Sequence, residues 1–390
     1  MINNLHISLT NLKNESRMLK ETDTLVKKSI FKKIYIVGLH EGDLKNIELI
    51  DEHREINRIS LKSRDLPKNL FFQLIKYMEY LTIILYKYRK KNIRVVNVHA
   101  LGLLPIGVFY KFFFNVKLIY DAHEYETQTQ GLRGLRKKLA SILEKVLIPY
   151  CDKTIVVSES IADEYKKLYP KLQRPIVVLN TPAYKEMKKK DIFREKFNIE
   201  KDTTIFLYQG GLSRGRGIKI LLEVFKGLSR YPVSNSKSTN TPVIVFMGYG
   251  ELENLVKEYS KKYENIYFHE AVTPDALLNY TSSADFGILF YENNCLNHYY
   301  CSPNKMFEYL MAEIPVIVSN LYEMKSLVES YSIGVVAKVN TPKGLKDAIK
   351  QAIKLDKKEL QQNIQKAKDI YNWEEQEKVL LDAYKDVYAN

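Results

Sequence analysis

Lys305 and Glu308 lie three residues apart at the start of a predicted helix. Ser302 is a typical N-cap residue and Pro303 fits the first helical position, so we expect the helix to begin there. A cation in a first helical turn opposes the helix dipole unless an anion binds beside it. Free amides at a helix N-terminus bind phosphate, so the spacing predicts a phosphate site with Lys305 and Glu308 on one face. A surface Lys–Glu pair has the same spacing and, taken alone, is the commoner explanation.

A glycine-rich turn containing two arginines follows a predicted strand near 205–209. It consists of Gly210, Gly211, Leu212, Ser213, Arg214, Gly215, Arg216 and Gly217. Close backbone approach, free amides and a delocalised cation are what phosphate binding needs. The spacing matches neither GxxxxGK[ST] nor GxGxxG, and a tight turn with solvated arginines is the alternative. A second glycine turn contains Gly250 and could lie beside a nucleotide base.

A histidine and three acids follow a predicted strand in the first half of the chain. The residues are Asp121, His123, Glu124 and Glu126. Rossmann-like domains present functional side chains at the carboxyl ends of their strands, which makes His123 a candidate site residue. The alternative is that His123 is buried for packing and that Asp121 caps a turn.

The composition limits the kinds of partner and compartment. The 390 residues carry a formal net charge of +14, which favours an acidic partner such as a nucleotide, a nucleic acid or an anionic lipid surface. The three cysteines are scattered and form no CxxC, which argues against disulfides and against a zinc site. No signal-peptide pattern and no run of 18 apolar residues is found, so we expect a cytoplasmic protein. A nucleic-acid binder is not expected, because recognised motifs are missing and the basic residues are dispersed.

Short β-branched runs alternate with helical patterns, which predicts an α/β fold with two doubly wound, Rossmann-like domains. The expected strands are 5–9, 33–38, 55–60, 94–98, 116–121, 153–157 and 175–179 in the first half, and 204–208, 243–247, 266–268, 285–290, 315–319 and 333–336 in the second. The expected helices of the first half are 15–28, 67–91, 101–114, 134–149 and 158–169. The polar stretch 234–240 is expected to be an exposed loop.

Pro182 and a charged stretch at 185–191 separate the two halves and are typical of a linker. The expected domains are therefore 1–185, which would bind the acceptor, and 186–370, which would bind the nucleotide. A helical tail with a break at 371–374 follows, and its last part, 371–390, is expected to pack back on the first domain. Two such domains would face each other across a ligand-binding cleft.

These stretches together resemble the retaining GT-B glycosyltransferases of family four, the glycosyl transferases group 1. Tyr120–Glu124 is similar to the YDxHE segment of that family, and 302–317 is similar to its PNKxxEYxxxxxPVI segment. The stretch 210–217 resembles the donor-phosphate loop, 151–158 resembles a strand that precedes a helix, and 14–21 resembles the first helix of one branch. The order and spacing of the motifs agree over nearly the whole chain.

The resemblance implies a hexosyltransferase-type enzyme that moves a sugar from a nucleoside diphosphate sugar to a glycan, lipid-linked or protein-linked acceptor. It implies retention of configuration, no catalytic metal and no cofactor besides the donor substrate. Arg216 and Lys305 take the positions that clamp the diphosphate, Glu308 that of the ribose-binding carboxylate, and His123 that of the histidine near the transferred sugar. The implied substrate-binding set is completed by Gly210, Gly211, Gly250, Ser302, Asn304 and Glu124.

Three features depart from the family pattern. The glycine-rich loop usual after the first strand is missing, and Ser8, Leu9, Thr10 and Asn11 stand in its place. Many members carry a second glutamate eight residues before the ribose-binding one, and Tyr300 stands there in this chain. A nucleotide-sugar-binding protein without turnover, acting as a regulatory partner, is therefore the alternative function. Glu313 replaces the glycine that commonly ends the motif helix, where a left-handed conformation is expected.

The predicted helix 134–149 is amphipathic and has a basic first turn. With Arg133 and the aromatic stretch 109–114 it could rest on an anionic lipid surface, which would place the protein on the inner face of the cell membrane. An ordinary core-facing helix with a solvated basic face would show the same pattern.

Overall fold

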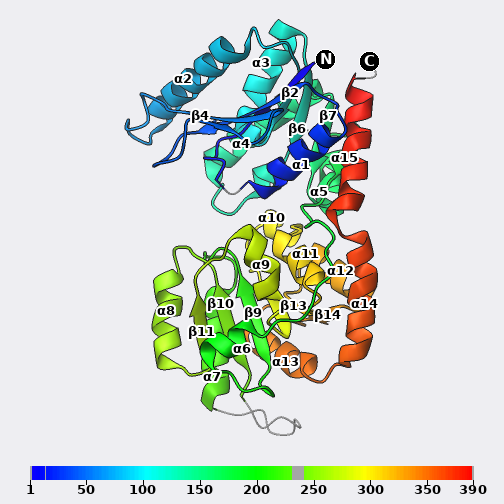
Figure 1. Ribbon diagram of the computed structural model, residues 1–390. Coiled ribbons are helices and arrows are strands. Elements are labelled where there is room, and N and C mark those ends of the chain that lie inside the picture. The colour runs from blue at the N-terminus through cyan, green and yellow to red at the C-terminus, as the bar shows by residue number, and fades with distance from the viewer. Residues whose placement is uncertain (1, 14, 231–240, 389–390) are drawn as a thin grey trace. The chain divides into compact units, whose positions relative to one another are not determined.

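The computed structural model describes residues 2–13, 15–230 and 241–388 (Figure 1). The chain divides into two compact units. The first contains the residues up to Val178 together with those from Glu377 onward, and the second runs from Leu179 to Gln376. The sequence placed the boundary seven residues later, in the charged stretch. The polar loop expected at 234–240 lies outside the described residues.

The first unit is built on an eight-stranded sheet with the order β3-β4-β2-β1-β5-β6-β7-β8. Neighbouring strands are parallel except β3 and β4. The strands are β1 (Asn3–Ile7), β2 (Lys33–Leu39), β3 (Ile47–Leu49), β4 (Arg54–Ile59), β5 (Ile93–Val98), β6 (Lys117–Asp121), β7 (Lys153–Val156) and β8 (Ile176–Val177). Strand order reverses between β1 and β5, and ligands of open sheets bind outside the carboxyl ends at such a point.

The helices of the first unit are α1 (Ser16–Lys27), α2 (Leu70–Tyr88), α3 (Leu104–Phe114), α4 (Gly134–Leu147) and α5 (Glu159–Leu168), with short 3₁₀ turns at Leu101–Leu103, Glu126–Gln128 and Ile148–Tyr150. Parallel strands need crossover connections, and these helices supply most of them. Two expectations were wrong in detail. The strand Ile47–Leu49 was not predicted, because its three residues are all exposed and show no burial pattern. The helix expected at 101–114 begins as a separate 3₁₀ turn, since Pro105 fits the first turn of the following helix.

The second unit contains a six-stranded parallel sheet with the order β11-β10-β9-β12-β13-β14. The strands are β9 (Ile205–Gln209), β10 (Val243–Met247), β11 (Ile266–His269), β12 (Phe286–Leu289), β13 (Val316–Val318) and β14 (Gly334–Val336). Alternate residues of β9 enter different cores: Ile205 and Leu207 pack on one face, and Phe206 and Tyr208 on the other. A parallel sheet buried on both faces gives such continuous apolar runs.

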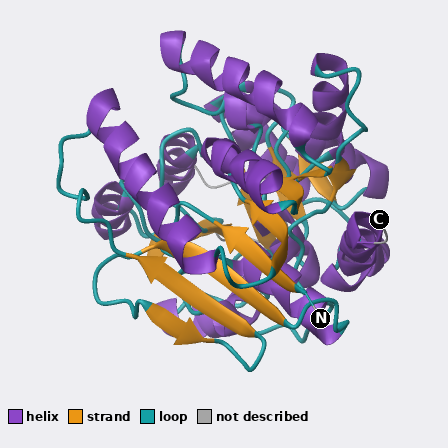
Figure 2. Ribbon diagram, turned by 90° about the horizontal axis from the view of Figure 1, so that it is seen from above, coloured by secondary structure: helices purple, strands orange, loops and turns teal. Residues whose placement is uncertain are grey.

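Helices flank the strands of each unit (Figure 2). Those of the second unit are α6 (Ile192–Phe197), α7 (Ile218–Arg230), α8 (Glu253–Lys262), α9 (Pro274–Thr281), α10 (Leu296–Tyr299), α11 (Asn304–Met311), α12 (Tyr322–Tyr331), α13 (Pro342–Ala352) and α14 (Lys357–Ile370), and α15 (Trp373–Tyr388) passes from the second unit to the first. Strand order reverses between β9 and β12, so the carboxyl ends of these two strands are the expected ligand site of this unit.

The last part of α15 packs within the first unit. The hydroxyl of Tyr384 accepts a hydrogen bond of 2.6 Å from Asn97 Nδ2, and its ring lies edge-on to Phe31. The elements are therefore those that the sequence predicted: two α/β units built on mainly parallel sheets, with a C-terminal helix. None of the described helices combines the length and the apolar composition that crossing a bilayer requires.

Candidate functional site

Lys305 is buried at the start of α11, with only 6% of the residue exposed. Its Nζ donates a hydrogen bond of 3.2 Å to the hydroxyl of Tyr208 and lies 4.3 Å from the centre of that ring. The ring of Tyr291, two residues after the end of β12, has its centre 5.6 Å from the same nitrogen. Lys305 is therefore not half of a surface ion pair, and the aromatic faces provide a site where a cation is held by π-electrons.

The environment of Lys305 lowers the pKa of its ammonium group. Burial, followed by the nearby Arg216 guanidinium, lowers the pKa of Lys305 to about 7, although Glu308 acts in the opposite direction. A cation desolvated in this way favours a bound anion, because the anion would replace the lost hydration. The position at the carboxyl ends of β9 and β12 is where such a ligand is expected.

The structure distinguishes the two arginines of the glycine-rich turn. Arg216 is half-buried, and its Nη1 donates a hydrogen bond of 2.8 Å to the Tyr291 hydroxyl. Arg214 has 76% of its side chain exposed and lies 3.6 Å from Glu251. Arg216 thus shares an aromatic partner with Lys305, and the two cations belong to one site. The alternative interpretation, a tight turn with solvated arginines, therefore applies to Arg214 only.

The glycines of the turn allow the backbone to pass close to these cations. A Cβ on Gly210 would lie 3.4 Å from Lys305 Nζ, and one on Gly248 would lie 2.0 Å from the carbonyl oxygen of Gly210. Gly211 is placed in the same turn, with its carbonyl accepting a hydrogen bond of 2.7 Å from Tyr208. Gly250 packs against this loop, since its Cβ would lie 2.7 Å from Leu212 O. Both predicted glycine turns therefore meet at the end of β9.

Replacing Gly217 with alanine is expected to destabilise the protein strongly. Gly217 has a φ of +74°, and a Cβ there would lie 1.9 Å from the carbonyl oxygen of Phe290. Strain at a left-handed position costs about 1–3 kcal/mol before the steric clash is added. Urea unfolding should show that loss, whereas Gly227→Ala in helix α7, where nothing lies within 4 Å of the new Cβ, should leave stability unchanged or raise it. Equal stability of the two variants would contradict the tight packing of the turn.

Glu308 is held by a residue that the sequence did not single out. Gln209 Nε2 donates a hydrogen bond of 2.6 Å to Glu308 Oε2, and Gln209 Oε1 accepts one of 2.8 Å from Thr281. The backbone amide of Gln209 also donates to the hydroxyl of Tyr309, 3.1 Å away. These bonds orient a half-buried carboxylate at the first turns of α11. A ligand hydroxyl is the donor that such a carboxylate would accept.

The other predicted residues of the second unit have different environments. Pro303, not Ser302, is the N-cap of α11, and the cap makes no side-chain hydrogen bond, so the predicted N-cap was wrong. Ser302 is half-buried and Asn304 is exposed at the first helical position. Tyr300 follows α10 with its ring 5.0 Å from Tyr299. Glu313 has a φ of +61°, as the glycine it replaces would permit, and forms an ion pair of 2.6 Å with buried Lys368.

In the first unit, Asp121 is fully buried at the end of β6 and holds three partners. Arg17 of α1 donates to both of its oxygens, at 3.1 and 2.8 Å. His99 Nδ1 and His123 Nε2 lie 3.1 and 3.0 Å from Asp121 Oδ2. Burial would raise the pKa of Asp121, but Arg17 and His123 hold it well below its ordinary value. Asp121 therefore does more than cap a turn: it anchors His123, which remains partly exposed. Glu124 is exposed.

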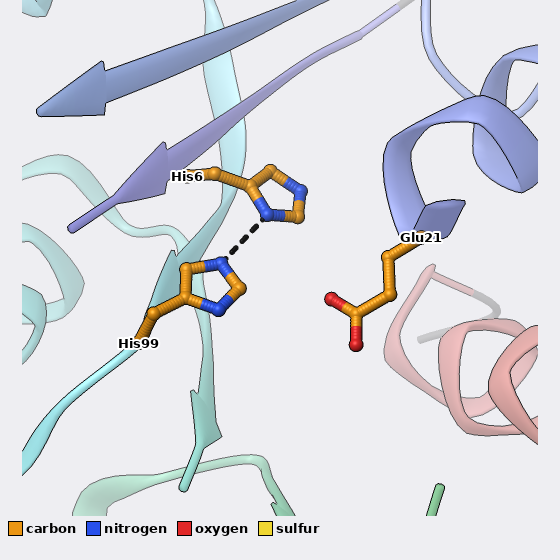
Figure 3. A group of neighbouring side chains, drawn as sticks. All are labelled: His6, Glu21 and His99. Carbon is orange, nitrogen blue, oxygen red and sulfur yellow. Dashed lines mark hydrogen bonds between the residues drawn. The ribbon is translucent and has the colours of Figure 1, made fainter. Parts of the chain in front are cut away.

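Two further histidines complete this cluster, and the sequence analysis missed them. His6 lies on β1 and His99 follows β5 (Figure 3), so both belong to the strand pair at which the order of the sheet reverses. The search for a metal site considered only ligands that are close together in the sequence. Residues 6, 99 and 123 are far apart in the chain, so that search did not find them. Part of the signal was available: each histidine stands in or just after a predicted strand, and the carboxyl ends of neighbouring parallel strands meet at one edge of a sheet.

Comparison with protein families supports the resemblance. Residues 189–369 match the model described as glycosyl transferases group 1, and residues 41–182 match that of glycosyltransferase family 4. Together the two models cover most of both units. No curated protein matches the chain by sequence.

Solved structures share the fold at low sequence identity. A sucrose-phosphate synthase from Thermosynechococcus elongatus aligns with a TM-score of 0.80 and 16% identity over 100% of both chains. HepE of Anabaena in complex with UDP-glucose gives 0.73 and 12% over 99% of this chain and 100% of its own. A glycosyltransferase from Rickettsia africae gives 0.71 and 16% over 100% and 99%. The two family matches and the two parallel α/β units lead to one conclusion: this chain belongs to the group 1, family-four glycosyltransferases of the GT-B fold.

Proposed function

We propose that the protein is a retaining glycosyltransferase that uses a nucleoside diphosphate sugar as donor and needs no catalytic metal. The observation that carries the proposal is the pairing of buried Lys305 with Arg216 beside the glycine turn after β9. Two cations and close backbone approach suit a diphosphate, and Glu308 suits the ribose hydroxyls. HepE of Anabaena, which has the same fold, was solved with UDP-glucose, and this supports a uridine nucleotide as the first donor to test.

The chemistry follows from charge development. When the bond between the sugar and the diphosphate breaks, the leaving phosphate gains negative charge, which Lys305 and Arg216 would stabilise in a site with little water. An oxygen of the departing phosphate would take the proton of the incoming hydroxyl on the same face of the sugar, giving retention. His123 would contact the transferred sugar. The acceptor is proposed to be a glycan, or a glycan carried by a lipid or a protein.

The stereochemical course tests this proposal. The protein is incubated with UDP-, GDP-, ADP- and CMP-sugars, and the one that raises the melting temperature most is taken forward, because a ligand that binds only the folded state stabilises it. Proton NMR of the first sugar released or transferred should show the anomeric configuration of the donor. Inversion would contradict retention. Binding without release or transfer would favour the regulatory nucleotide-sugar-binding protein that Tyr300 in the family glutamate position suggests.

The lowered pKa of Lys305 gives a pH dependence for donor binding. A bound diphosphate favours the ammonium form, so binding should be accompanied by proton uptake at pH values above the free-protein pKa of about 7. Affinity should therefore fall as the pH rises from 7 to 9. Calorimetry in buffers of different ionisation enthalpy measures the proton uptake directly. In Lys305→Met this proton uptake should be lost, and its persistence would assign the titration to another group.

We also propose that the first unit docks on an anionic lipid surface through α4. The apolar stripe of this helix faces outward in the structure: Leu135, Leu139, Ile142 and Val146 are 68%, 49%, 49% and 57% exposed. The buried residue of the helix is Glu144, which accepts hydrogen bonds from Tyr165 and Tyr169. The explanation that α4 is a core-facing helix with a solvated basic face therefore does not fit this stripe.

Aromatic and basic side chains border the α4 stripe. Phe112 and Phe113 of α3 are 63% and 70% exposed, and the ring of Phe112 lies 5.2 Å from that of Tyr150. Arg136, Lys138 and Lys145 are exposed along α4. Interfacial helices typically insert apolar side chains at the boundary of the acyl chains. Their basic side chains then contact the anionic headgroups. An anionic lipid surface is therefore the partner that fits this face.

Flotation with vesicles tests the docking surface. The protein should float with vesicles that contain anionic lipid at low salt and remain at the bottom with neutral vesicles. The double variant Leu139→Glu, Ile142→Glu should lose flotation, whereas Ile370→Glu, at a position that is 48% exposed in the second unit, should not. Equal flotation of the double variant and the wild type would contradict docking through α4.

A further inference from the structure

Gln209 is the last residue of β9 and is buried, with only 1% of the residue exposed. Its two neighbours in the chain both border the site: the hydroxyl of Tyr208 accepts a hydrogen bond from Lys305, and Gly210 begins the glycine turn. A side chain buried to this extent is not in contact with a bound nucleotide. Any effect of Gln209 on a ligand must therefore pass through another residue.

The polar atoms of Gln209 bond to three residues of the same unit. Its Nε2 donates to Glu308 Oε2 at 2.6 Å, its Oε1 lies 2.8 Å from the hydroxyl of Thr281, and its backbone amide donates to the hydroxyl of Tyr309 at 3.1 Å. The Tyr309 hydroxyl in turn donates to the backbone carbonyl of Leu207 at 3.0 Å. Two successive residues of α11 are thus bonded to β9, which fixes the first turns of the helix against the end of the strand.

The side-chain amide of Gln209 can have only one orientation. An ionised carboxylate only accepts hydrogen bonds, so the amide nitrogen must be the atom that faces Glu308. The reversed amide would place two acceptors 2.6 Å apart. The amide oxygen then faces Thr281, whose hydroxyl lies 2.8 Å from this oxygen and 2.8 Å from the carbonyl oxygen of Leu277 in α9. Thr281 therefore supplies the donor that the buried amide oxygen needs.

Glu308 is the member of this network that a ligand can reach. It is half-buried, whereas Gln209 and Thr281 are 1% and 0% exposed. A carboxylate accepts about four hydrogen bonds, and Gln209 supplies one of them from the protein side. A carboxylate held in this way loses little conformational freedom when a ligand binds, which strengthens its hydrogen bonds to that ligand.

We propose that Gln209 and Thr281 are positioning residues that hold Glu308 in place for the ribose hydroxyls, and that they thereby determine how strongly the site prefers ribonucleotides to deoxyribonucleotides. The role rests on the proposed function, in which Glu308 binds the ribose. Without these bonds the carboxylate would be mobile, and the hydroxyls would contribute less to binding. The contribution of the diphosphate would remain, because Lys305 is held separately by Tyr208.

The competing explanation is that Gln209 and Thr281 only pack α9 and α11 on the sheet. In that case their removal should weaken the binding of every nucleotide by the same factor, because the whole site would loosen. A positioning role acts only on ligands that carry the ribose hydroxyls. Comparing UDP with 2′,3′-dideoxy-UDP therefore separates the two explanations.

Isothermal titration of the full-length protein with UDP and 2′,3′-dideoxy-UDP tests the proposal, and the corresponding GDP pair is titrated in parallel. The wild type should bind the ribonucleotide about 10- to 100-fold more tightly than the dideoxynucleotide, the scale of hydrogen bonds to a charged group. Gln209→Leu removes the donor to Glu308 and should lower this ratio by about 3- to 10-fold, the scale of one net hydrogen bond. Its affinity for the dideoxynucleotide should change by less than about 2-fold.

Substitutions at position 281 test the second positioning residue. Thr281→Val keeps the shape of the side chain but leaves the amide oxygen of Gln209 as a buried acceptor without a donor, so the amide is no longer held. The preference for the ribonucleotide should fall in this variant. Thr281→Ser keeps the hydroxyl and should retain the wild-type ratio. When Glu308→Gln is already present, adding Thr281→Val should not change the ratio further, because the residue through which Thr281 acts has been altered.

Ser283→Ala is the matched control. Ser283 is fully buried two residues after Thr281, and its hydroxyl donates to the backbone carbonyl of Asn279 at 2.9 Å. The variant therefore also removes a buried hydroxyl beside α9, but one that is not bonded to Gln209. It should keep the wild-type preference for the ribonucleotide.

Three results would overturn the positioning role. They are equal binding of the two nucleotides by the wild type, a wild-type ratio in both Gln209→Leu and Thr281→Val, and an equal loss of affinity for both nucleotides in these variants. If Gln209→Leu does not fold, the comparison of Thr281→Val with Thr281→Ser still decides. A protein that shows the predicted ratios but transfers no sugar would contradict the proposed transferase and leave the positioning role intact. A protein that binds none of the four nucleotides would contradict both.

Discussion

Replacing Lys305 with methionine is expected to lower kcat/KM for sugar transfer by about 10²–10³-fold without lowering the free energy of unfolding. Methionine keeps most of the volume of the buried side chain and removes the cation that meets the leaving phosphate. The wild-type protein bears the cost of desolvating that cation, as the pKa of about 7 indicates. An apolar replacement removes this cost, so stability should stay the same or rise. Donor titrations and urea unfolding measure the two effects.

The controls for this prediction lie in the same unit. Arg216→Ala should lose activity on a similar scale, because it removes the second cation from the same site. Lys350→Met, at an exposed position in α13, should leave kcat/KM unchanged. If Lys305→Met kept the wild-type kcat/KM, Lys305 would not be the residue that stabilises the leaving group.

Asp121→Asn is expected to destabilise the protein by about 3–5 kcal/mol, the scale for removing one partner of a buried ion pair. The carboxylate is fully buried and accepts two hydrogen bonds from Arg17. The substitution would leave the buried Arg17 with Glu21, whose pKa is about 8 in the wild type, as the acidic group beside it. Urea unfolding at pH 7 measures the loss. Asp382→Asn, whose carboxylate is 72% exposed and pairs with Lys385, should change stability by less than about 0.5 kcal/mol.

The pH dependence of this difference has a definite sign. The pKa of Asp121 in the folded protein lies well below its ordinary value of 3.8, so the stabilisation is fully present above that value. It is lost only as the pH falls through the lower, folded-state pKa. The gap between the wild type and Asp121→Asn should therefore stay constant from about pH 5 to pH 8 and narrow in stronger acid. A gap that widened on acidification, or one below about 1 kcal/mol at pH 7, would contradict the assigned role of this carboxylate.

Local sequence patterns predicted most of the elements but not their ends. The order of strands and helices follows from apolar periodicity. The turn after β9 follows from its glycines, because glycine is needed where two backbone segments approach closely. Ser302 shows the limit. A serine before a proline is a good N-cap by propensity, yet the helix begins one residue later, with Pro303 as its N-cap. Burial of Lys305 was equally hidden, because a surface pair and a site residue share the same spacing.

The partners of the site residues could not be predicted, because they come from distant segments. Tyr208 and Tyr291 enclose Lys305 only because β9 and β12 are neighbours in the sheet. The cluster of His6, His99 and His123 depends in the same way on β1, β5 and β6 lying side by side. A single sequence shows periodicity along one segment, whereas these contacts depend on strand order. These contacts could have been anticipated from one rule: the carboxyl ends of neighbouring parallel strands lie at the same edge of the sheet.

Isothermal titration of nucleoside diphosphates tests the central claim most directly. UDP and GDP are titrated into the wild type and Lys305→Met, each with EDTA and with Mg²⁺. The wild type should bind one nucleotide per chain, with the same affinity under both conditions. Lys305→Met should bind it about 10- to 100-fold more weakly, the scale of losing a hydrogen bond to a charged group. Binding that requires Mg²⁺, or that is equally tight in Lys305→Met, would contradict a diphosphate site built on this buried lysine.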